Sequence, residues 1–484
     1  MSDLATVMSD FALPRGVLDR ALRRVTALWR AAPEPENGVE AFSAAMRGCL
    51  EARGGEVSAR ARAAGLAQAY LEANEAGRLD FLRALAGFDS DPEAVRAAYE
   101  RVAAATGIAE RAAAKARLRR ALEPPRTRLL TQFAAIPDGV KFAVDLRADL
   151  LARMAGEPML EALEADLKAL LAAWFDVGFL ELRRIDWSSP AALLEKLVEY
   201  EAVHRIRTWR DLKNRLDSDR RCYAFFHPRM PAEPLIFVEV ALTQGMADKV
   251  QPLLDEKAPV LDPAAADTAI FYSINNCQRG LDGISFGNFL IKRVVTELSV
   301  AFPGLKAFAT LSPIPGFRRW LDDRIAAEDA TLLTDDEALA LREAAPADPA
   351  LPAPGSNGTA REETPAQTLA RLIARRSLAR QEAVARLLDP VLARLCARYL
   401  LAESSRNGRR ARDPVAHFHL SNGARVERIN PGGDRSEKGW RESAGLMVNY
   451  RYDPARIEDY HEEYAGEGRR AASSGVRRLA RGFV

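Results

Sequence analysis

The residues of this chain that are best placed to do chemistry are a serine and a group of glycines. Ser312 follows the apolar run Lys306–Leu311 and precedes Pro313, which biases the serine toward an extended backbone and stiffens its exit. The glycines that stand before the next helix-like run are Gly280, Gly283 and Gly287. A glycine backbone can approach a phosphate closely, and the amino end of a helix adds partial positive charge. Together they predict a fixed hydroxyl and a phosphate cradle.

The elements that must position these residues are predicted by the surrounding pattern. Thr268–Ile274 is a short β-branched and aromatic run, Phe289–Phe302 repeats apolar residues with helical period, and Lys306–Leu311 is again strand-like. A helix of about fourteen residues is long enough for a right-handed crossover, so the two strands should be parallel neighbours. Ligands of open α/β sheets bind at the carboxyl ends of such strands. We therefore expect the loop Asn275–Asn288 and Ser312 to share one cleft.

A histidine near the carboxyl end could move a proton. His419 titrates near neutral pH in its ordinary state and could be protonated as a substrate binds. We predict that it lies on a strand, Val415–Leu420, which pairs with Arg425–Ile429 around the turn Ser421-Asn422-Gly423, because Asn-Gly between alternating residues indicates a hairpin. The turn would hold the imidazole in place.

A metal site is the alternative that the two neighbouring histidines raise. His417 and His419 would lie on the same face of a strand, as an H-x-H pair. The chain has only five histidines, and no third ligand has suggestive spacing. We therefore predict no metal site.

Five separated blocks carry a resemblance to a known family. They are HPRMPAEPLIFVEVALT at 227–243, FYSINNCQRGLDGISFGNFLIKRVV at 271–295, TLSPIPGFRRWL at 310–321, DPVAHFHLSNGARVERIN at 413–430 and SAGLMVNYRY at 443–452. In these blocks the chain resembles malonyl-CoA decarboxylase, and the resemblance covers most of residues 160–465. It implies a helical amino-terminal domain, a mixed α/β catalytic domain of the GNAT-type acyltransferase fold, and a homotetramer built from dimers.

The same resemblance implies the site. Ser312 and His419 match the catalytic serine and histidine of the family, which uses no metal and no cofactor. His419 would protonate the carbanion, and Ser312 would bind the carboxylate or enolate oxygen rather than attack as a nucleophile. Tyr452 lies in a matched block and either bonds to His419 or substrate or packs in the core. The segment that matches the malonyl-CoA-binding part of the family is Asp282, Gly283, Ile284, Ser285, Phe286, Gly287 and Asn288.

The chain divides by composition. From about Pro14 to Trp187 it is almost wholly helical in pattern, with Leu160, Leu163, Leu167, Leu170 and Trp174 as one stripe. We predict an all-α helical bundle over 1–187 that serves self-association, followed by the catalytic domain over 188–484. Residues 344–365 are rich in proline, alanine and glycine and are expected to form a flexible excursion.

Charge and cysteine content limit the partners. The 484 residues include 69 basic and 67 acidic side chains, so the net charge of +2 gives no reason to expect nucleic acid as a partner. No apolar stretch is long enough for a membrane span. The four cysteines form no C-x-x-C pair, and we find neither a secretory leader nor a peroxisomal address, so we expect a bacterial cytoplasmic protein.

Two other functions remain open from the sequence. A GNAT-type acyltransferase would share the phosphate loop and would move acetyl from coenzyme A to an amine, but it would not need the Ser312/His419 pair. A non-catalytic malonyl-CoA sensor would bind without turnover. Release of carbon dioxide from malonyl-CoA without an amine separates decarboxylation from both.

Overall fold

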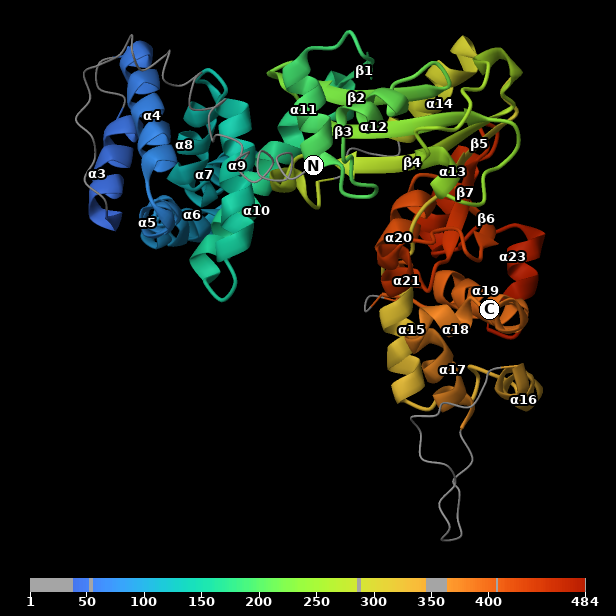
Figure 1. Cartoon of the computed structure of the whole chain (residues 1–484). Helices are drawn as coiled ribbons and strands as arrows, with labels where there is room; N and C mark the ends of the chain where they lie inside the picture. Colours follow the sequence, from blue (N-terminus) through green and yellow to red (C-terminus); the bar gives the residue numbers. More distant parts are fainter. Residues whose placement is uncertain (1–37, 52–54, 285–288, 345–363, 406–407, 484) are drawn as a thin grey trace. The chain divides into compact units, whose positions relative to one another are not determined.

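The computed structural model describes residues 38–51, 55–284, 289–344, 364–405 and 408–483 (Figure 1). These residues form two compact units. The first unit contains the described residues of Met1–Glu181, together with Phe226–Leu235 and Asn276–Phe286, and the second contains the rest. The first long segment of the first unit ends at Glu181, and the division at residue 187 stays a prediction.

The described residues of the first unit up to Trp174 form helices, as the pattern predicts. They are α3 (Val39–Leu50), α4 (Gly55–Glu72), α5 (Glu75–Ala86), α6 (Pro92–Ala104), α7 (Ile108–Leu122), α8 (Pro125–Ala134), α9 (Gly139–Arg153) and α10 (Pro158–Trp174). On α10 the buried leucines are Leu160, Leu163, Leu167 and Leu171. Leu171 replaces the predicted Leu170 because the buried face of this helix advances by four residues at its last step.

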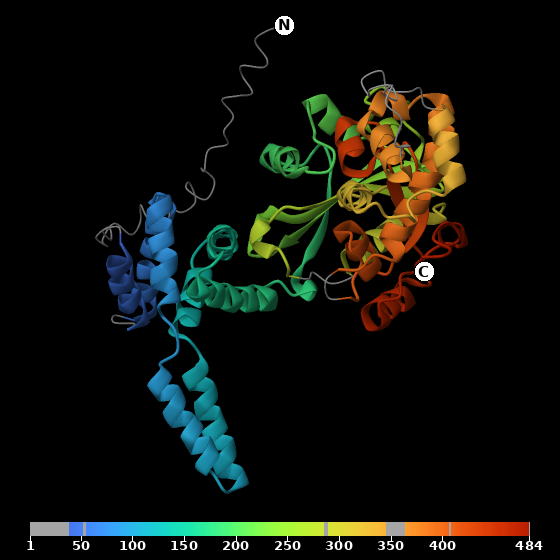
Figure 2. The same cartoon turned by 90° about the horizontal axis from the view of Figure 1, so that it is seen from below.

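The α6–α7 hairpin differs from the other helices of this unit. Figure 2 shows the two helices packed along each other and extended away from the remaining helices of the unit. Each helix buries a single residue, Ala98 on α6 and Ala114 on α7. Tyr99 and Ile108 are exposed, at 62% and 92%. The hairpin therefore has apolar surface that its own unit does not cover.

Residues near the end of the predicted bundle are not helical. Val177–Phe179 forms a single 3-10 turn, η1, and Glu181–Ile185 forms strand β1. The prediction of helix as far as Trp187 is therefore wrong here. The side-chain oxygen of Asp176 accepts a hydrogen bond from the amide of Gly178, which favours a short turn over another helical turn.

Among the described residues, the sheet has seven strands in the order β1-β2-β3-β4-β5-β7-β6. The others are β2 (Arg220–His227), β3 (Met230–Thr243), β4 (Thr268–Asn276), β5 (Ala307–Thr310), β6 (Arg425–Asn430) and β7 (Met447–Tyr452). The predicted strands Thr268–Ile274, Lys306–Leu311 and Arg425–Ile429 are confirmed within two residues at their ends. A fold with an amino-terminal helical region and a mixed α/β sheet is thus present.

The central strand–helix–strand element is also confirmed. Helix α14 (Phe289–Ala301) connects β4 to β5, and the two strands pair in parallel from Thr268↔Ala307 to Phe271↔Thr310. The last hydrogen bond of this ladder runs from the amide of Leu311 to the carbonyl of Phe271. Two residues on, Pro313 has no N–H to continue the ladder. The chain therefore leaves β4 at Ser312, whose amide donates instead to Val448.

The register separates two faces of the sheet. The pairs Phe271↔Thr310 and Phe308↔Tyr452 put these four side chains on one face, since side chains of paired residues point the same way. The opposite face carries an apolar cluster of Ala241, Val250, Leu253, Ile270, Tyr272, Ala309, Leu311 and Met447. The apolar cluster anchors the strands, and the first face carries the polar residues described below.

The remaining helices belong mainly to the second unit. They are α11 (Ala191–Tyr200), α12 (Trp209–Arg215), α13 (Gln251–Leu254), α15 (Phe317–Ala326), α16 (Asp335–Ala344), α17 (Pro365–Ala374), α18 (Arg376–Ala379), α19 (Glu382–Leu401), α20 (Pro414–Ser421), α21 (Glu437–Ser443), α22 (Ile457–Glu462) and α23 (Ser474–Leu479). Short turns are η2 (Pro263–Ala265), η3 (Arg279–Leu281) and η4 (Glu463–Glu467). The predicted excursion at 344–365 falls almost wholly outside the described residues.

Helix α20 contradicts the predicted hairpin. Residues Pro414–Ser421, which carry His419, form a helix rather than a strand, and β6 pairs with β7. Asp413 caps the helix amino end and Pro414 occupies its first turn, where a missing N–H costs nothing. At the other end Gly423 has a φ of 77°, and its amide donates to the carbonyl of Leu420. The Asn-Gly pair is a helix stop here, not a hairpin turn.

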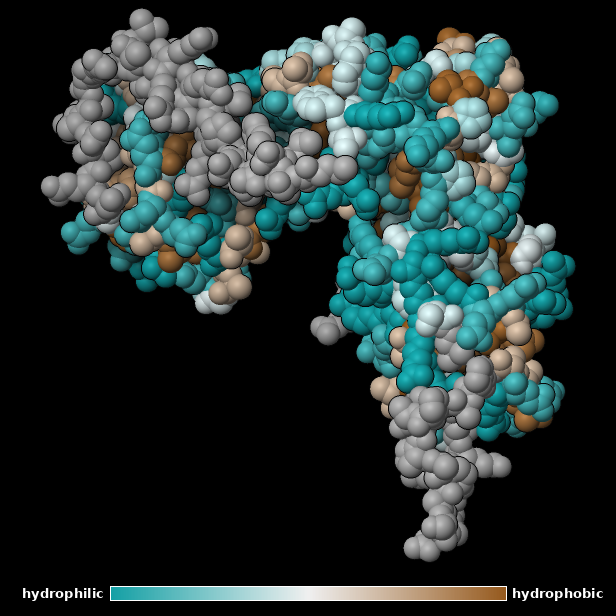
Figure 3. Space-filling model, viewed as in Figure 1, coloured by the Kyte–Doolittle hydropathy of each residue, from teal (hydrophilic) through white to brown (hydrophobic). Residues whose placement is uncertain are grey.

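The face of the protein drawn in Figure 3 is mainly polar. Hydrophilic residues cover most of the face in Figure 3, and hydrophobic residues appear there as small separate patches. None of the helices described by the structure combines the length and the apolar character that crossing a membrane would need.

Candidate active site

Ser312 and His419 lie within hydrogen-bonding distance although 107 positions separate them. The Ser312 Oγ is 3.0 Å from the His419 Nε2, and both residues belong to the second unit. Reciprocal backbone bonds of 2.9 and 3.0 Å between Ser312 and Val448 tie the serine to β7. His419 lies on the second turn of α20. A strand end and a helix therefore bring the two predicted residues together.

Tyr452 extends the contact on the other side of the imidazole. Its hydroxyl lies 2.8 Å from the His419 Nδ1. The ring of Tyr450 stacks on the imidazole with a centroid distance of 4.5 Å. Ser312, His419 and Tyr452 are 6%, 3% and 1% exposed. Both nitrogens of the imidazole thus have a hydroxyl partner, and the ring is held in one plane.

Burial controls the charge of these groups. Desolvation lowers the pKa of His419 to about 3, so the imidazole is neutral at pH 7 without a ligand. Desolvation also raises the pKa of Tyr452 well above its ordinary value, so its hydroxyl keeps its proton. The free site is therefore uncharged, which differs from an imidazole that titrates near neutral pH.

Thr310 is a member of this site that the sequence did not reveal. It is fully buried, and its Oγ1 accepts hydrogen bonds from the Ser312 Oγ at 2.8 Å and from the Tyr450 amide at 3.1 Å. The spacing of two residues on an extended segment puts Thr310 and Ser312 on the same face. The spacing of the two hydroxyl residues in Thr-Leu-Ser could therefore have identified Thr310 from the sequence.

The predicted H-x-H face does not exist. On a helix, residues two apart point in different directions, and the Nδ1 of His417 lies 2.8 Å from the hydroxyl of Tyr464 rather than near His419. Within the described part of the chain, no group of three His, Cys, Asp or Glu side chains is arranged to hold a metal ion.

The predicted malonyl-CoA segment is described only in part. Ser285, Phe286, Gly287 and Asn288 lie outside the described residues. The rest of the segment, Asp282 to Ile284, belongs to the first unit, where a buried arginine holds it.

That arginine is Arg147 of α9. Its Nη1 donates to the carbonyls of Gly280 at 2.7 Å and Asp282 at 2.9 Å, and its charge is paired with Glu164 at 2.6 Å. At Gly280 an added Cβ would lie 1.8 Å from the carbonyl of Val144, so this glycine serves close packing against α9. It was predicted to let a phosphate approach, and the packing gives another reason for it.

Gly283 fits the phosphate prediction better. Its φ of 71° is one that L side chains rarely adopt. The ammonium group of Lys168 would lie 3.5 Å from a Cβ built at this position. A cation therefore stands beside the turn.

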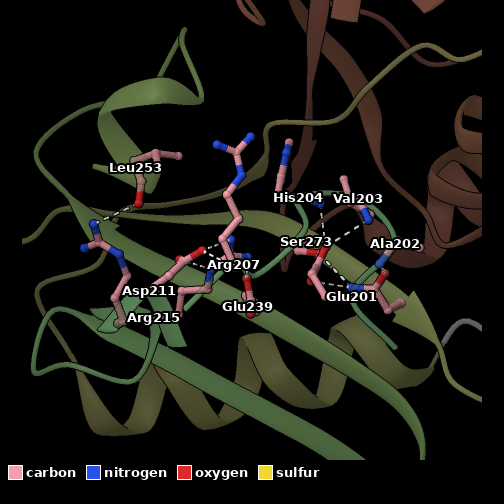
Figure 4. Close-up of polar contacts among 12 residues, drawn as sticks. Glu201, Ala202, Val203, His204, Arg207, Asp211, Arg215, Glu239, Leu253 and Ser273 are labelled. Atoms are coloured by element: carbon pink, nitrogen blue, oxygen red, sulfur yellow. Dashed lines mark hydrogen bonds and ion pairs between the residues drawn. The ribbon is translucent and has the colours of Figure 1, made fainter. Parts of the chain in front are cut away.

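A buried carboxylate holds the end of β4 (Figure 4). Glu201 accepts hydrogen bonds from the Ser273 Oγ at 2.7 Å, from the Asn275 Nδ2 at 2.8 Å and from the His204 amide at 2.6 Å. Desolvation raises the pKa of Glu201, opposed by these bonds. Ser273 and Asn275 alternate with Phe271 and so lie on the sheet face of Thr310. No local pattern predicts this contact, because it joins residues more than seventy positions apart.

Arg215 forms a second buried cluster in Figure 4. It donates to Asp211 at 2.8 Å and to Glu239 at 3.0 Å, and all three residues are less than 10% exposed. Desolvation raises the pKa of Glu239 to about 8, against the opposing effect of the Arg215 charge. The cluster joins α12 to β3.

An arginine-lined cavity of about 950 Å³ lies elsewhere in the second unit. Two of its arginines are paired with glutamates that also line it, Arg425 with Glu427 and Arg469 with Glu467. Ser312, His419 and Tyr452 are not among its lining residues. We therefore assign the candidate chemistry to the buried group of Ser312, His419 and Tyr452 and not to this cavity.

Two models of known protein families match most of the chain. The model described as "Malonyl-CoA decarboxylase N-terminal domain" matches residues 88–175, and "Malonyl-CoA decarboxylase C-terminal domain" matches residues 178–483. Two curated relatives are called "Malonyl-CoA decarboxylase, mitochondrial". The protein of Anser anser anser is 39% identical over 350 residues, 70% of this chain and 66% of that protein. The protein of Rattus norvegicus is 40% identical over 350 residues, 70% of this chain and 68% of that protein.

The chain spans about two thirds of the length of those curated relatives. Two solved structures match it over nearly their own whole length. The malonyl-CoA decarboxylase of Rhodopseudomonas palustris has a TM-score of 0.80 and 40% identity, with 91% of this chain and 99% of that chain covered. That of Agrobacterium vitis has a TM-score of 0.79 and 38% identity, with 90% and 99% covered. The chain belongs to the malonyl-CoA decarboxylase family.

Proposed function

We propose that this chain converts malonyl-CoA and one proton into acetyl-CoA and carbon dioxide, with its own side chains and no cofactor. The observation that carries the proposal is the buried row of Thr310, Ser312, His419 and Tyr452 in a chain of this family. Breaking the bond to the carboxylate leaves an electron pair that spreads onto the thioester oxygen as an enolate. The thioester is itself the electron sink, so the protein has to stabilise the enolate and protonate carbon.

We assign the proton of the neutral imidazole from the row of hydrogen bonds, since the distances to His419 fit either tautomer. The hydroxyl of Ser312 donates to Thr310, so a lone pair of its oxygen faces His419. In a neutral imidazole the Nε2 then carries the hydrogen, and the Nδ1 accepts from the hydroxyl of Tyr452. In this assignment the hydroxyl of Ser312 is not aimed at a base. This supports a binding and orienting role for Ser312 rather than nucleophilic attack.

The proton for carbon comes from His419 once the substrate is present. The site without ligand is neutral because burial disfavours the imidazolium. The malonyl carboxylate is an opposite charge, and an opposite charge nearby raises the pKa of histidine. When the carboxylate leaves as carbon dioxide, the negative charge moves to the enolate, and the imidazolium gives its proton to the adjacent carbon. One proton is consumed in each turnover.

The segment Asp282–Asn288 is proposed to bind the nucleotide part of the substrate. Its support is the positive φ of Gly283, the nearby Lys168 and the two bonds of Arg147 to the preceding backbone. The segment is followed by α14, whose amino end favours anions. The GNAT-type description of the fold is likewise a proposal, supported by the parallel β4–β5 pair that ends at Ser312.

We also propose an oligomeric assembly and a cellular compartment for this chain. A homotetramer built from dimers is supported by the α6–α7 hairpin, whose exposed Tyr99 and Ile108 lie on a surface that its own unit leaves uncovered. The four cysteines, all buried thiols, suit a reducing cytoplasm. Sedimentation of the purified full chain tests the assembly.

The direct test of the function is release of carbon dioxide from malonyl-CoA by the purified chain, without any amine and with a metal chelator present. The proposal predicts equal amounts of carbon dioxide and acetyl-CoA, with the chelator making no difference. Binding of malonyl-CoA without release would favour a sensor. Release that stops with the chelator would refute the cofactor-free mechanism.

A further inference from the structure

One buried carboxylate touches both elements that carry the reacting pair. Asp413 is fully buried and stands immediately before α20, the helix of His419. Its Oδ1 accepts hydrogen bonds from the amides of Val415 at 3.0 Å and Ala416 at 2.9 Å. The backbone carbonyl of Asp413 accepts a hydrogen bond from the amide of His417 at 2.9 Å. The first turn of the histidine helix is therefore built on this residue.

The other carboxylate oxygen points to the serine segment. The Oδ2 of Asp413 lies 3.4 Å from the amide of Gly316 and 3.4 Å from the hydroxyl of Tyr399, both donors. Gly316 is four residues after Ser312, and the segment between them contains Pro313 and Pro315. Two prolines leave little freedom between the serine and the glycine. A constraint on Gly316 is thus passed on to the serine.

The glycine is needed for this approach. A Cβ added at Gly316 would lie 2.2 Å from the hydroxyl oxygen of Tyr399 and 3.5 Å from the Oδ2 of Asp413. The backbone φ of Gly316 is −92°, so the reason for glycine is space and not conformation. The segment after the serine is packed directly against the carboxylate and its tyrosine partner.

We infer that Asp413 is a positioning residue that sets the distance between the Ser312 hydroxyl and the His419 imidazole by bonding to both of their supporting segments. The inference rests on the proposed function, in which these two groups act together on one substrate. A displacement of about 1 Å in such a pair costs on the order of 100-fold in rate. The helix cap alone would explain stability, whereas the bond to Gly316 has no role in the helix.

The Asp413→Asn variant separates the two roles. An asparagine keeps an oxygen for the amides of Val415 and Ala416, since it is as good an N-cap as aspartate. Its amide group replaces the second oxygen and cannot accept from Gly316. We expect kcat to fall roughly 10- to 100-fold, with KM changed by less than about threefold.

A matched control exists in the first unit. Asp91 also precedes a proline at the start of a helix, and its side chain accepts from the amide of Glu93 at 3.0 Å. Asp91→Asn should leave kcat and KM unchanged. Asp413→Ser is the second variant, used if Asp413→Asn is poorly folded. It keeps a capping hydroxyl but does not reach Gly316, so it should show the same loss of kcat.

A rescue pair tests the serine side of the link. Gly316→Ala should lower kcat because the new methyl group displaces the hydroxyl of Tyr399 and the segment after Ser312. Adding Tyr399→Phe removes that hydroxyl and should restore at least half of the lost activity. No restoration, together with a normal Asp413→Asn, overturns the inference.

A readout without turnover keeps the inference apart from the function. In protein with ¹⁵N-labelled histidine, the Nε2 signal of His419 reports its hydrogen bond to Ser312. We expect this signal to move in Asp413→Asn and to stay in Asp91→Asn. If the wild-type chain releases no carbon dioxide but the signal moves, the function fails and the positioning role stands. If the wild type is active and Asp413→Asn retains both kcat and the signal, the positioning role is refuted.

Discussion

Binding of the malonyl carboxylate should draw a proton into the site. Desolvation lowers the pKa of His419 to about 3, so at pH 7 roughly one molecule in ten thousand carries the imidazolium. The proposed mechanism needs that proton in every productive complex. The substrate must therefore raise the pKa of His419 on binding.

The size of this effect can be worked out. A carboxylate about 4 Å from the imidazolium in a medium of effective dielectric constant about 20 contributes about 4 kcal/mol of attraction. This corresponds to a rise of about 3 pKa units, because one unit is about 1.4 kcal/mol. The sign is upward because the opposite charge favours the protonated form. His419 in the complex should then have a pKa of about 6, starting from about 3.

The assay is calorimetric titration with a malonyl-CoA analogue whose thioester is replaced by an unreactive thioether. Comparison of two buffers with different ionisation enthalpies gives the number of protons taken up. We expect about half a proton per site at pH 6 and close to none at pH 8. Acetyl-CoA has no malonyl carboxylate and serves as the control for protons bound by coenzyme A itself.

Two results would refute this reasoning. One is no difference between the analogue and acetyl-CoA at pH 6. The other is equal proton uptake in wild type and in His419→Gln, which would assign the proton to another group.

Three further predictions concern residues around the site. Tyr452→Phe leaves the His419 Nδ1 buried without a donor, at a cost of about 1–3 kcal/mol, so kcat should fall roughly 10- to 100-fold at nearly constant KM in steady-state assays; unchanged kcat would contradict its donor role. Replacing the Arg147/Glu164 pair by Met/Gln should raise KM roughly tenfold while kcat is retained, and loss of kcat alone would argue against the nucleotide-binding segment. Arg215→Met leaves two buried carboxylates unpaired and should destabilise the protein by about 3–5 kcal/mol in denaturant titrations, more than a version that also carries Glu239→Gln.

The strand–helix–strand element could be predicted because its signals are local. Thr268–Ile274 and Lys306–Leu311 are short apolar runs, and the run between them has helical period over a suitable length. The position of Ser312 at the end of β5 follows from the same pattern. Pro313 then explains why the serine leaves β4, since it cannot continue the parallel ladder.

The element that carries His419 was predicted wrongly because two readings of one segment compete. Val415–Leu420 alternates apolar and other residues as a strand does, and Asn422-Gly423 looks like a hairpin turn. The Asp-Pro pair that precedes it is a helix start, and it decides the outcome through the cap of Asp413. His419 lies within hydrogen-bonding distance of Ser312, and its orientation comes from a helix.

The buried network of Glu201 could not be predicted at all. Its partners Ser273 and Asn275 lie on another element, and no local pattern marks a glutamate that will be buried. The neutral state of the His419 imidazole could not be predicted for the same reason. Histidine has an ordinary pKa near neutrality, and only the complete packing around His419 lowers it.

The most direct test of the proposed chemistry compares turnover with binding in Ser312→Ala and His419→Asn. The account predicts that each variant loses at least about 100-fold in kcat, as removal of a preorganised donor does, while the Kd for malonyl-CoA changes by less than about tenfold. His461→Asn is the control, since this histidine bonds to the carbonyl of Ser421 and should keep full activity. Near-normal carbon dioxide release from either of the first two variants would contradict the account.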